Sequence, residues 1–198
     1  MKKGILSERP TPRQIVRFFG MMLSGRITRS ILEKWLGDVS DKRPDVDWLR
    51  VYGLLGMTDA YVSEVARLDV AARSGFWTVP VVRGLTINKI VEALRKSGVD
   101  VYTYTNDLDA AVPTNERDPN KESYIVSFKE TIEADLEFAN LSADDLVSRG
   151  IKASTLLEHL LLWLWFVINT GGRLDVKDVT LCAGSRDSGG GVPNAWAA

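Results

Sequence analysis

The sequence predicts an α+β protein in which a helical amino-terminal segment precedes a ferredoxin-like (βαββαβ) sheet with helices on one face. Two patterns and the composition support this fold class. Apolar residues recur at helical spacing in the first 75 residues, and strand-like and helix-like stretches alternate from residue 76 to residue 184. A content of 45% hydrophobic and 26% charged residues is typical of a globular chain that buries a sizeable core.

We expect three parts along the chain. Residues 1–75 form a helical, basic segment, residues 76–186 an α+β domain, and residues 187–198 a glycine-rich carboxy-terminal tail. Four helices are expected in the first part, at residues 12–23, 28–36, 48–55 and 59–72. A proline in the first turn of the first helix and glycines after the first two helices support these limits.

Four strands and two helices are expected in the second part. The strands are FWTVPVV at 76–82, VDVYTYT at 99–105, SYIVSF at 123–128 and VKDVTLCAG at 176–184. Thr86 caps a helix that ends at Gly98, and an apolar helix that begins at Ser154 or Thr155 precedes the last strand. Pro80 places the first strand at a sheet edge or a bulge, because proline has no N–H to donate to a ladder.

Four stretches of the last 120 residues resemble a family of bacterial proteins with no established activity. They are VYTYTNDLDAAV, NERDPN, SYIVSF and GGRLDVKDVTLCAGSR. The resemblance implies a bacterial source, and it assigns no catalytic residue.

Charge is distributed unevenly along a chain whose net charge is -1. Residues 1–40 contain eight lysines or arginines against three acidic residues, and residues 100–150 contain twelve acidic residues against four basic ones. The small net charge excludes a surface built throughout for nucleic acid or an anionic membrane. The basic and acidic regions are expected either to bind partners or to contact each other.

The chain has the features of a cytoplasmic protein. Its single cysteine cannot form an internal disulfide, and no apolar run follows the two lysines near its start. The longest wholly apolar run, residues 160–168, is too short to span a bilayer and predicts a buried helix.

Three candidate catalytic features fail for lack of partner residues. The run DSGG at 187–190 matches the surroundings of the nucleophile in trypsin-like serine proteases, but a protease needs a histidine and an acid beside Ser188. The only histidine, His159, lies in an apolar helix without such a motif, and it lacks a second metal ligand at helical spacing. Cys182 lies in an alternating strand, where a lone cysteine is usually a small core residue. We therefore assign no catalytic residue.

A candidate metal site lies in the polar loop NDLDAAVPTNERDPNKE. Asp107 and Asp109 are two residues apart, and Asp118 follows in the same loop. Carboxylate oxygens are the ligands that Ca²⁺ and Mg²⁺ prefer, although this loop lacks the glycine and glutamate of an EF-hand. The alternative is ordinary turn chemistry, in which these side chains bond to the local backbone.

A non-enzymatic protein-binding or assembly module is the leading functional hypothesis, because no acid, base and nucleophile converge. The apolar run LLLWLWFVI carries more apolar surface than one helix face needs, which favours either a core position or an interface with a protein partner or a second copy. The candidate interface residues are Trp163, Trp165 and Phe166.

Two alternatives remain open. The first is a nucleic-acid-binding protein in which two short amino-terminal helices contact phosphates. Its candidate residues are Arg13, Arg17, Arg26, Arg29 and Lys34. The second is a metal-dependent hydrolase that uses the three loop aspartates with His159.

Overall fold

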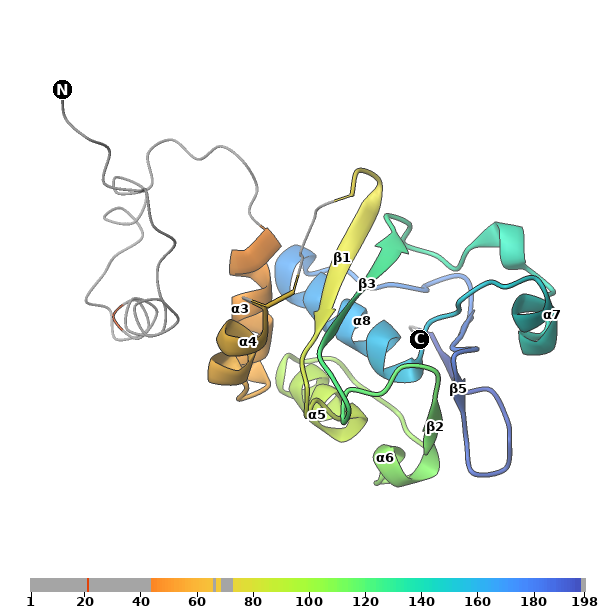
Figure 1. The fold of residues 1–198 in the computed structure, drawn as a ribbon, viewed down its shortest axis with the longest axis horizontal. Coiled ribbons are helices and arrows are strands. Elements are labelled where there is room, and N and C mark those ends of the chain that lie inside the picture. Colours follow the sequence, from red (N-terminus) through yellow and green to blue (C-terminus); the bar gives the residue numbers. More distant parts are fainter. Residues whose placement is uncertain (1–20, 22–43, 66, 69–72, 197–198) are drawn as a thin grey trace.

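The computed structural model describes residue 21 and residues 44–65, 67–68 and 73–196 of the chain (Figure 1). These residues combine helices and strands, which confirms the α+β class. Among them, no helix is long and apolar enough to cross a membrane. The two helices expected at residues 12–23 and 28–36 fall almost entirely outside the described residues.

Helices and strands follow one another along the chain in mixed order. The helices are α3 (Pro44–Leu54), α4 (Thr58–Val65), α5 (Ile87–Lys96), α6 (Leu108–Ala111), the 3-10 helix η1 (Leu136–Phe138), α7 (Ala143–Ser148) and α8 (Leu156–Thr170). The strands are β1 (Phe76–Val81), β2 (Thr114–Asn115), β3 (Tyr124–Lys129), β4 (Thr180–Leu181), β5 (Ser185–Arg186) and β6 (Asn194–Ala195). Helix α3 starts earlier than expected because Pro44, interpreted as part of a connector, suits the first helical turn.

The strands of the described residues form three two-stranded sheets instead of one four-stranded sheet. Strands β1 and β3 pair antiparallel from Phe76 opposite Lys129 to Val81 opposite Tyr124. The much shorter pairs are β2 with β5 and β4 with β6. The ferredoxin-like arrangement is therefore not formed by these residues. Its last expected strand shortens to β4 and pairs with β6, not with β1.

The strand expected at residues 99–105 is also absent from the structure. Its side chains do alternate, with Tyr102 and Tyr104 exposed and the residues between them half-buried. However, its bonds are local: the Arg95 guanidinium donates to the Val101 carbonyl and to Thr103 Oγ1, and the Val99 N–H donates to the Leu94 carbonyl at the end of α5. The alternation thus marks an extended surface segment, for which no neighbouring strand completes a ladder.

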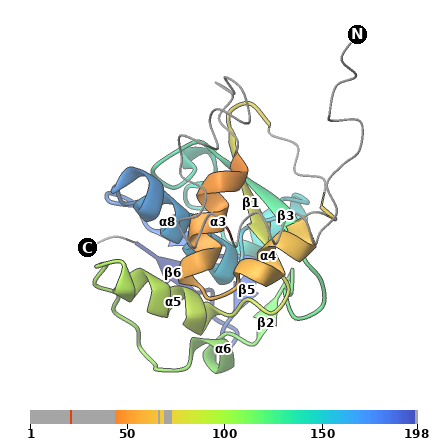
Figure 2. The same cartoon turned by 90° about the vertical axis from the view of Figure 1, so that its left-hand side faces the viewer.

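Helix α8 lies at the centre of the core. It contacts α3, α5, β1 and β6, and ten of its fifteen residues are buried. Thr155 caps its start in a reciprocal capping box with Glu158, and Gly171 ends it in the left-handed conformation at φ 70°. The apolar sequence of the helix is explained by burial on several sides, as the views in Figures 1 and 2 show.

Helix α3 closes the outer edge of β1. Trp48 Nε1 donates to the Thr78 carbonyl at 3.0 Å, and the Tyr52 hydroxyl donates to the Pro80 carbonyl at 2.7 Å and accepts from the Val82 N–H at 3.1 Å. Pro80 therefore stands at an outward-facing position of an edge strand, as its missing N–H requires. The core crosses the expected boundary between residues 75 and 76, because these α3 side chains pack with β1 and α8.

The expected tail contributes to the fold as far as residue 196. Strand β6 pairs with β4, and Ala195 is buried beside α8. Asp187 Oδ1 accepts the N–H groups of Gly189 and Gly191, both at 2.8 Å, which closes the glycine-rich turn. Trp196 remains partly exposed.

Replacing Tyr52 with phenylalanine tests the closure of the β1 edge. Loss of the hydroxyl leaves a buried carbonyl and a buried N–H without their partner, so the free energy of unfolding is expected to fall by about 1–3 kcal/mol. Urea unfolding followed by circular dichroism measures this change. Tyr104→Phe is the matched control, because Tyr104 is 87% exposed; equal effects of the two substitutions would contradict the assignment.

Candidate functional site

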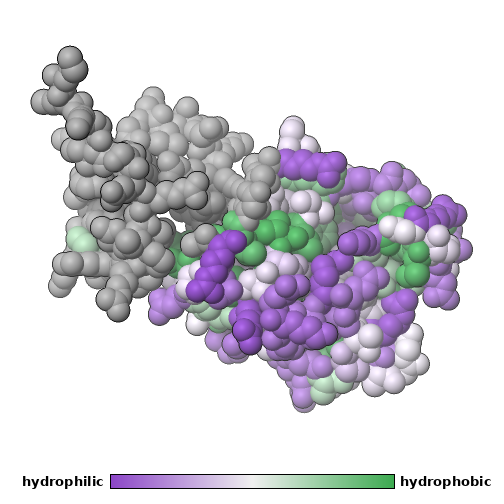
Figure 3. Space-filling model, viewed as in Figure 1, coloured by the Kyte–Doolittle hydropathy of each residue, from purple (hydrophilic) through white to green (hydrophobic). Residues whose placement is uncertain are grey.

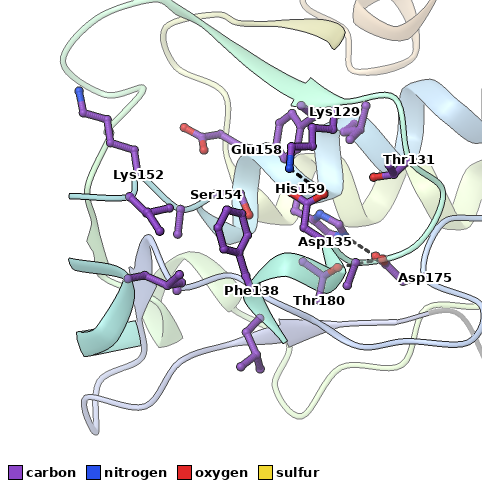
Figure 4. A pocket seen from close by; sticks show the side chains of 18 of the residues that line it. Lys129, Thr131, Asp135, Phe138, Lys152, Ser154, Glu158, His159, Asp175 and Thr180 are labelled. Atoms are coloured by element: carbon purple, nitrogen blue, oxygen red, sulfur yellow. Dashed lines mark hydrogen bonds and ion pairs between the residues drawn. The ribbon is translucent and has the colours of Figure 1, made fainter. Parts of the chain in front are cut away.

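A cavity of about 1000 Å³ lies beside β3, and we call it the β3 cavity (Figure 4). One wall is the outer side of β3, and the facing wall is the segment 151–154 that leads into α8. Residues 131–146, with η1 and the start of α7, form a third side. Glu158, His159 and Leu162 of α8 line its interior.

Lys129, at the end of β3, holds the third side of the cavity in place. Its ammonium group lies 3.7 Å from Asp135 and also pairs with Glu137, and it lies 5.4 Å from the centre of the Phe138 ring. The bond to Glu137 raises the pKa of Lys129 above its ordinary value. Ser142 and Asp145 form a capping box at the start of α7, which fixes the far end of this side.

A buried histidine–carboxylate pair lies inside the cavity. His159 Nε2 is 2.7 Å from Asp175 Oδ2, and Thr180 Oγ1 donates to Asp175 Oδ1 at 2.8 Å. The backbone of Asp175 has φ 52°, a left-handed conformation that aspartate tolerates better than most residues, and its N–H donates to the Ile132 carbonyl. This arrangement fixes the orientation of the imidazole ring.

A second buried pair joins the loop before β3 to α8. The Arg117 guanidinium contacts both carboxylate oxygens of Glu158, at 2.6 and 2.8 Å, and donates to the Ala153 carbonyl at 2.6 Å. Glu158 is 0% exposed, and the bond to it raises the pKa of Arg117. Burial, with the Glu158 charge nearby, raises the pKa of the Tyr124 hydroxyl. The carboxylates of Glu158 and Asp175 therefore both have positively charged or hydrogen-bonding partners.

The protease-like run and the cysteine have structural roles. Ser188 is exposed and its N–H donates to the Ala111 carbonyl, while Asp187 closes the adjacent turn. Cys182 is completely buried, and this burial raises the pKa of its thiol above the ordinary value, which disfavours the thiolate. Among the described residues, no serine, threonine or cysteine side chain hydrogen-bonds to His159.

The three loop aspartates bond to the backbone around them. Asp109 accepts the Ile87 and Asn88 N–H groups at the start of α5, at 2.7 and 3.2 Å. Asp107 accepts from the Asn88 side chain and the Ala110 N–H, and these bonds lower its pKa. Asp118 accepts the Asn120 N–H. In the part of the chain that the structure describes, no group of three or more His, Cys, Asp or Glu side chains could hold a metal ion.

The residues expected at an interface lie in the core of this chain. Trp163 and Phe166 are only 7% and 8% exposed. Trp165 stacks on Trp48 with ring centres 5.8 Å apart, and it lies 6.0 Å from the Trp77 ring. Aromatic packing inside one chain leaves Trp163 and Phe166 inaccessible to a partner. The candidate nucleic-acid residues Arg13, Arg17, Arg26, Arg29 and Lys34 lie outside the described residues.

Apolar side chains are exposed around the mouth of the β3 cavity, and we call them the apolar rim. The rim residues are Ile132, Leu136, Val179 and Leu181. Leu136 is 81% exposed and Leu181 is 50% exposed. Figure 3 shows part of this apolar surface in green at the right of the view, over the segment between β3 and α7. No periodic pattern in the sequence marks this rim, because its residues come from irregular segments, the short 3-10 helix η1 and a two-residue strand.

Comparison with protein-family models, curated proteins and solved structures found no match for this chain.

Substituting Arg117 tests whether the second buried pair supports the cavity. Arg117→Met leaves the Glu158 carboxylate buried and unpaired, so the free energy of unfolding is expected to fall by about 3–5 kcal/mol. Adding Glu158→Leu removes the unpaired charge and should recover all but about 1 kcal/mol, the usual cost of losing a helix-capping bond. Denaturant unfolding measures both variants, and a double variant no more stable than the single one would contradict the pairing.

Thiol labelling tests the position of Cys182. Because burial raises the pKa of this thiol, we expect it to react with Ellman's reagent at pH 8 far more slowly in the native protein than in urea. A Cys182→Ala variant gives the background rate. Fast, stoichiometric labelling of the native protein would contradict its burial and reopen the possibility of a reactive cysteine.

Proposed function

We propose that this protein is a non-enzymatic binding module that holds a segment of another protein at the β3 cavity. The observation that carries the proposal is the gathering of exposed apolar side chains at the mouth of this cavity. Large apolar side chains that are exposed together on a water-facing surface commonly mark interaction sites. The rim residues lie on two neighbouring segments, which are joined by hydrogen bonds from the Asp175 N–H to the Ile132 carbonyl and from the Lys177 N–H to Glu133, so one partner could contact both.

The chemistry of the cavity interior favours binding over catalysis. Asp175 and Glu158 have their hydrogen bonds supplied by His159, Thr180 and Arg117. Nucleophilic catalysis needs a nucleophile within hydrogen-bond reach of the base, and the described side chains supply none to His159. The polar pairs instead bond the segments that form the walls to α8, and these bonds hold the walls in place.

The interface differs from the one expected from sequence. Trp163 and Phe166 are used by the core, whereas the rim residues come from the acidic segment after β3 and from the segment around β4. A protein partner and a second copy of this chain are the two occupants that such a rim suits. We propose a separate protein as the occupant, and the crosslinking below distinguishes it from a second copy.

Photocrosslinking at the rim tests the proposal. The photoreactive residue p-benzoylphenylalanine is placed at position 136 or 181 of the full chain, expressed in its native cells and irradiated. We expect an adduct of one defined mass at both positions. Because Leu136 is highly exposed, the substitution should leave the unfolding transition almost unchanged.

The control position for crosslinking is 104, which is exposed but lies outside the cavity lining. Adducts that form equally at all three positions, or at none, would count against the proposed function. An adduct of twice the chain mass at positions 136 and 181 would assign the rim to a homo-oligomer.

A further inference from the structure

The outer edge of β3 presents backbone groups that are paired by no strand of the described residues. The Glu130 N–H donates to the Gly75 carbonyl, which makes this pair a hydrogen-bonded one. Hydrogen-bonded and non-hydrogen-bonded pairs alternate in an antiparallel ladder. The Thr78–Ser127 and Pro80–Ile125 pairs are therefore non-hydrogen-bonded pairs, and their backbone polar groups point away from the ladder.

The bonds made by α3 independently confirm which pairs of the ladder point their backbone groups outward. The Thr78 and Pro80 carbonyls accept from Trp48 and Tyr52, so they face α3 and not β3. Across the ladder, the backbone groups of Ile125 and Ser127 must then point to the opposite side. The described residues supply no hydrogen bond to these groups. One edge of the two-stranded sheet is closed by aromatic side chains, and the other is left open.

The open edge faces the β3 cavity. Residues 125–129 line this cavity, and the segment 151–154 lies on its other side. The Arg117 guanidinium holds that segment through the Ala153 carbonyl, so the facing wall is fixed by a bond and does not pair with β3. Phe128, Phe138, Leu162 and Leu174 supply apolar lining. An extended chain beside β3 could bond to its edge and place alternate side chains on this apolar lining.

The charge around the cavity indicates the charge of the segment that it could bind. Six acidic residues line it, against three basic ones and His159. Two of the basic residues are already paired, since Arg117 binds Glu158 and Lys129 binds Asp135 and Glu137. The segment 130–150, part of which lines the cavity, is itself acidic and has Arg149 as its only base. A basic chain complements this surface, whereas an acidic one would be repelled.

We propose that the outer edge of β3 binds, by β-strand addition, an extended basic segment of another protein in which apolar residues occupy alternate positions. This inference rests on the proposed function and gives it a mode and a class of partner. The backbone of the added segment bonds to the outward groups of Ile125 and Ser127. Its inward side chains lie on the apolar lining, and its lysines or arginines lie among the carboxylates of the mouth.

Selection from a phage-displayed library of random twelve-residue peptides tests the inference, with the full-length protein as bait. We expect the enriched peptides to alternate apolar residues with lysine, arginine or other polar residues. Each enriched peptide is synthesised, and its affinity is measured by isothermal titration calorimetry. Acidic peptides, or peptides without alternation, would overturn the inference, as would the absence of any enrichment.

The variant Ser127→Pro removes one outward N–H and places a ring in the path of the added strand. Proline already occupies the equivalent outward position 80 in β1, so the fold should tolerate the change. We expect binding to weaken by about tenfold or more, the effect of losing a hydrogen bond and close backbone approach. Ser127→Ala, which keeps the N–H, should bind like the unaltered protein; equal binding by all three proteins would overturn the inference.

Peptide N-methylation tests the same bonds without altering the protein. Single N-methyl groups are moved along the selected peptide, and alternate positions should lose affinity while the positions between them keep it. Uniform tolerance would overturn strand addition even if Ser127→Pro failed to fold.

The two proposals can fail separately. Crosslinking at positions 136 and 181 combined with failed peptide selection would retain a partner at the rim and reject strand addition. Self-association that the selected peptide disrupts, measured by light scattering, would assign the edge to a second copy and overturn the proposal of a separate partner. Failure of both experiments would reject the proposed function itself.

Discussion

The structure depends on the burial of two adjacent polar residues, Glu158 and His159, at the start of an otherwise apolar helix. Neighbouring positions on a helix point about 100° apart, so the two side chains cannot share one partner. Glu158 binds Arg117 from the loop before β3, and His159 binds Asp175 from the loop after α8. Because a buried charge without a partner is strongly destabilising, these two loops are fixed wherever α8 is fixed.

The same two contacts extend to the walls of the β3 cavity. Arg117 also binds the Ala153 carbonyl, which holds the segment 151–154 away from β3. Asp175 bonds to Thr180 through its carboxylate and to Ile132 through its N–H, which joins the segments on the other side. One turn of α8 therefore positions opposite walls, although the residues that form them are far apart in sequence. The polar pairs in the cavity therefore connect its walls to α8.

Local signals in the sequence predicted the local structure well. The helix at Thr86, the apolar helix after Thr155 and the strand pair FWTVPVV and SYIVSF follow from capping residues and periodicity, which act within one element. The four-stranded sheet was wrong because alternation at residues 101–105 reports one exposed and one half-buried face of an extended segment, and not a neighbouring strand. The sequence also left open whether the glycine-rich end is ordered, because the pairing of β6 with β4 depends on residues outside that end.

The site was harder to predict for a physical reason. A histidine in an apolar helix signals that a polar partner exists, since buried polar groups are almost always hydrogen-bonded, but it does not say which of many aspartates provides it. Asp175 lies in an irregular loop and has a left-handed backbone conformation, which no periodic pattern in the sequence predicts. Likewise, the tryptophans of α8 signal a large apolar surface but not whether the same chain covers it.

The position of the open edge inside a cavity explains how the protein can keep such an edge. Free strand edges invite pairing with other sheets, and proteins usually block them with charges, proline or a covering element. On β1 the covering element is α3, with Trp48 and Tyr52 as donors. On β3 the edge is recessed between the segment 151–154 and the acidic segment after Lys129. Walls on both sides of the edge are a covering of the kind that protects a strand edge from pairing with other sheets.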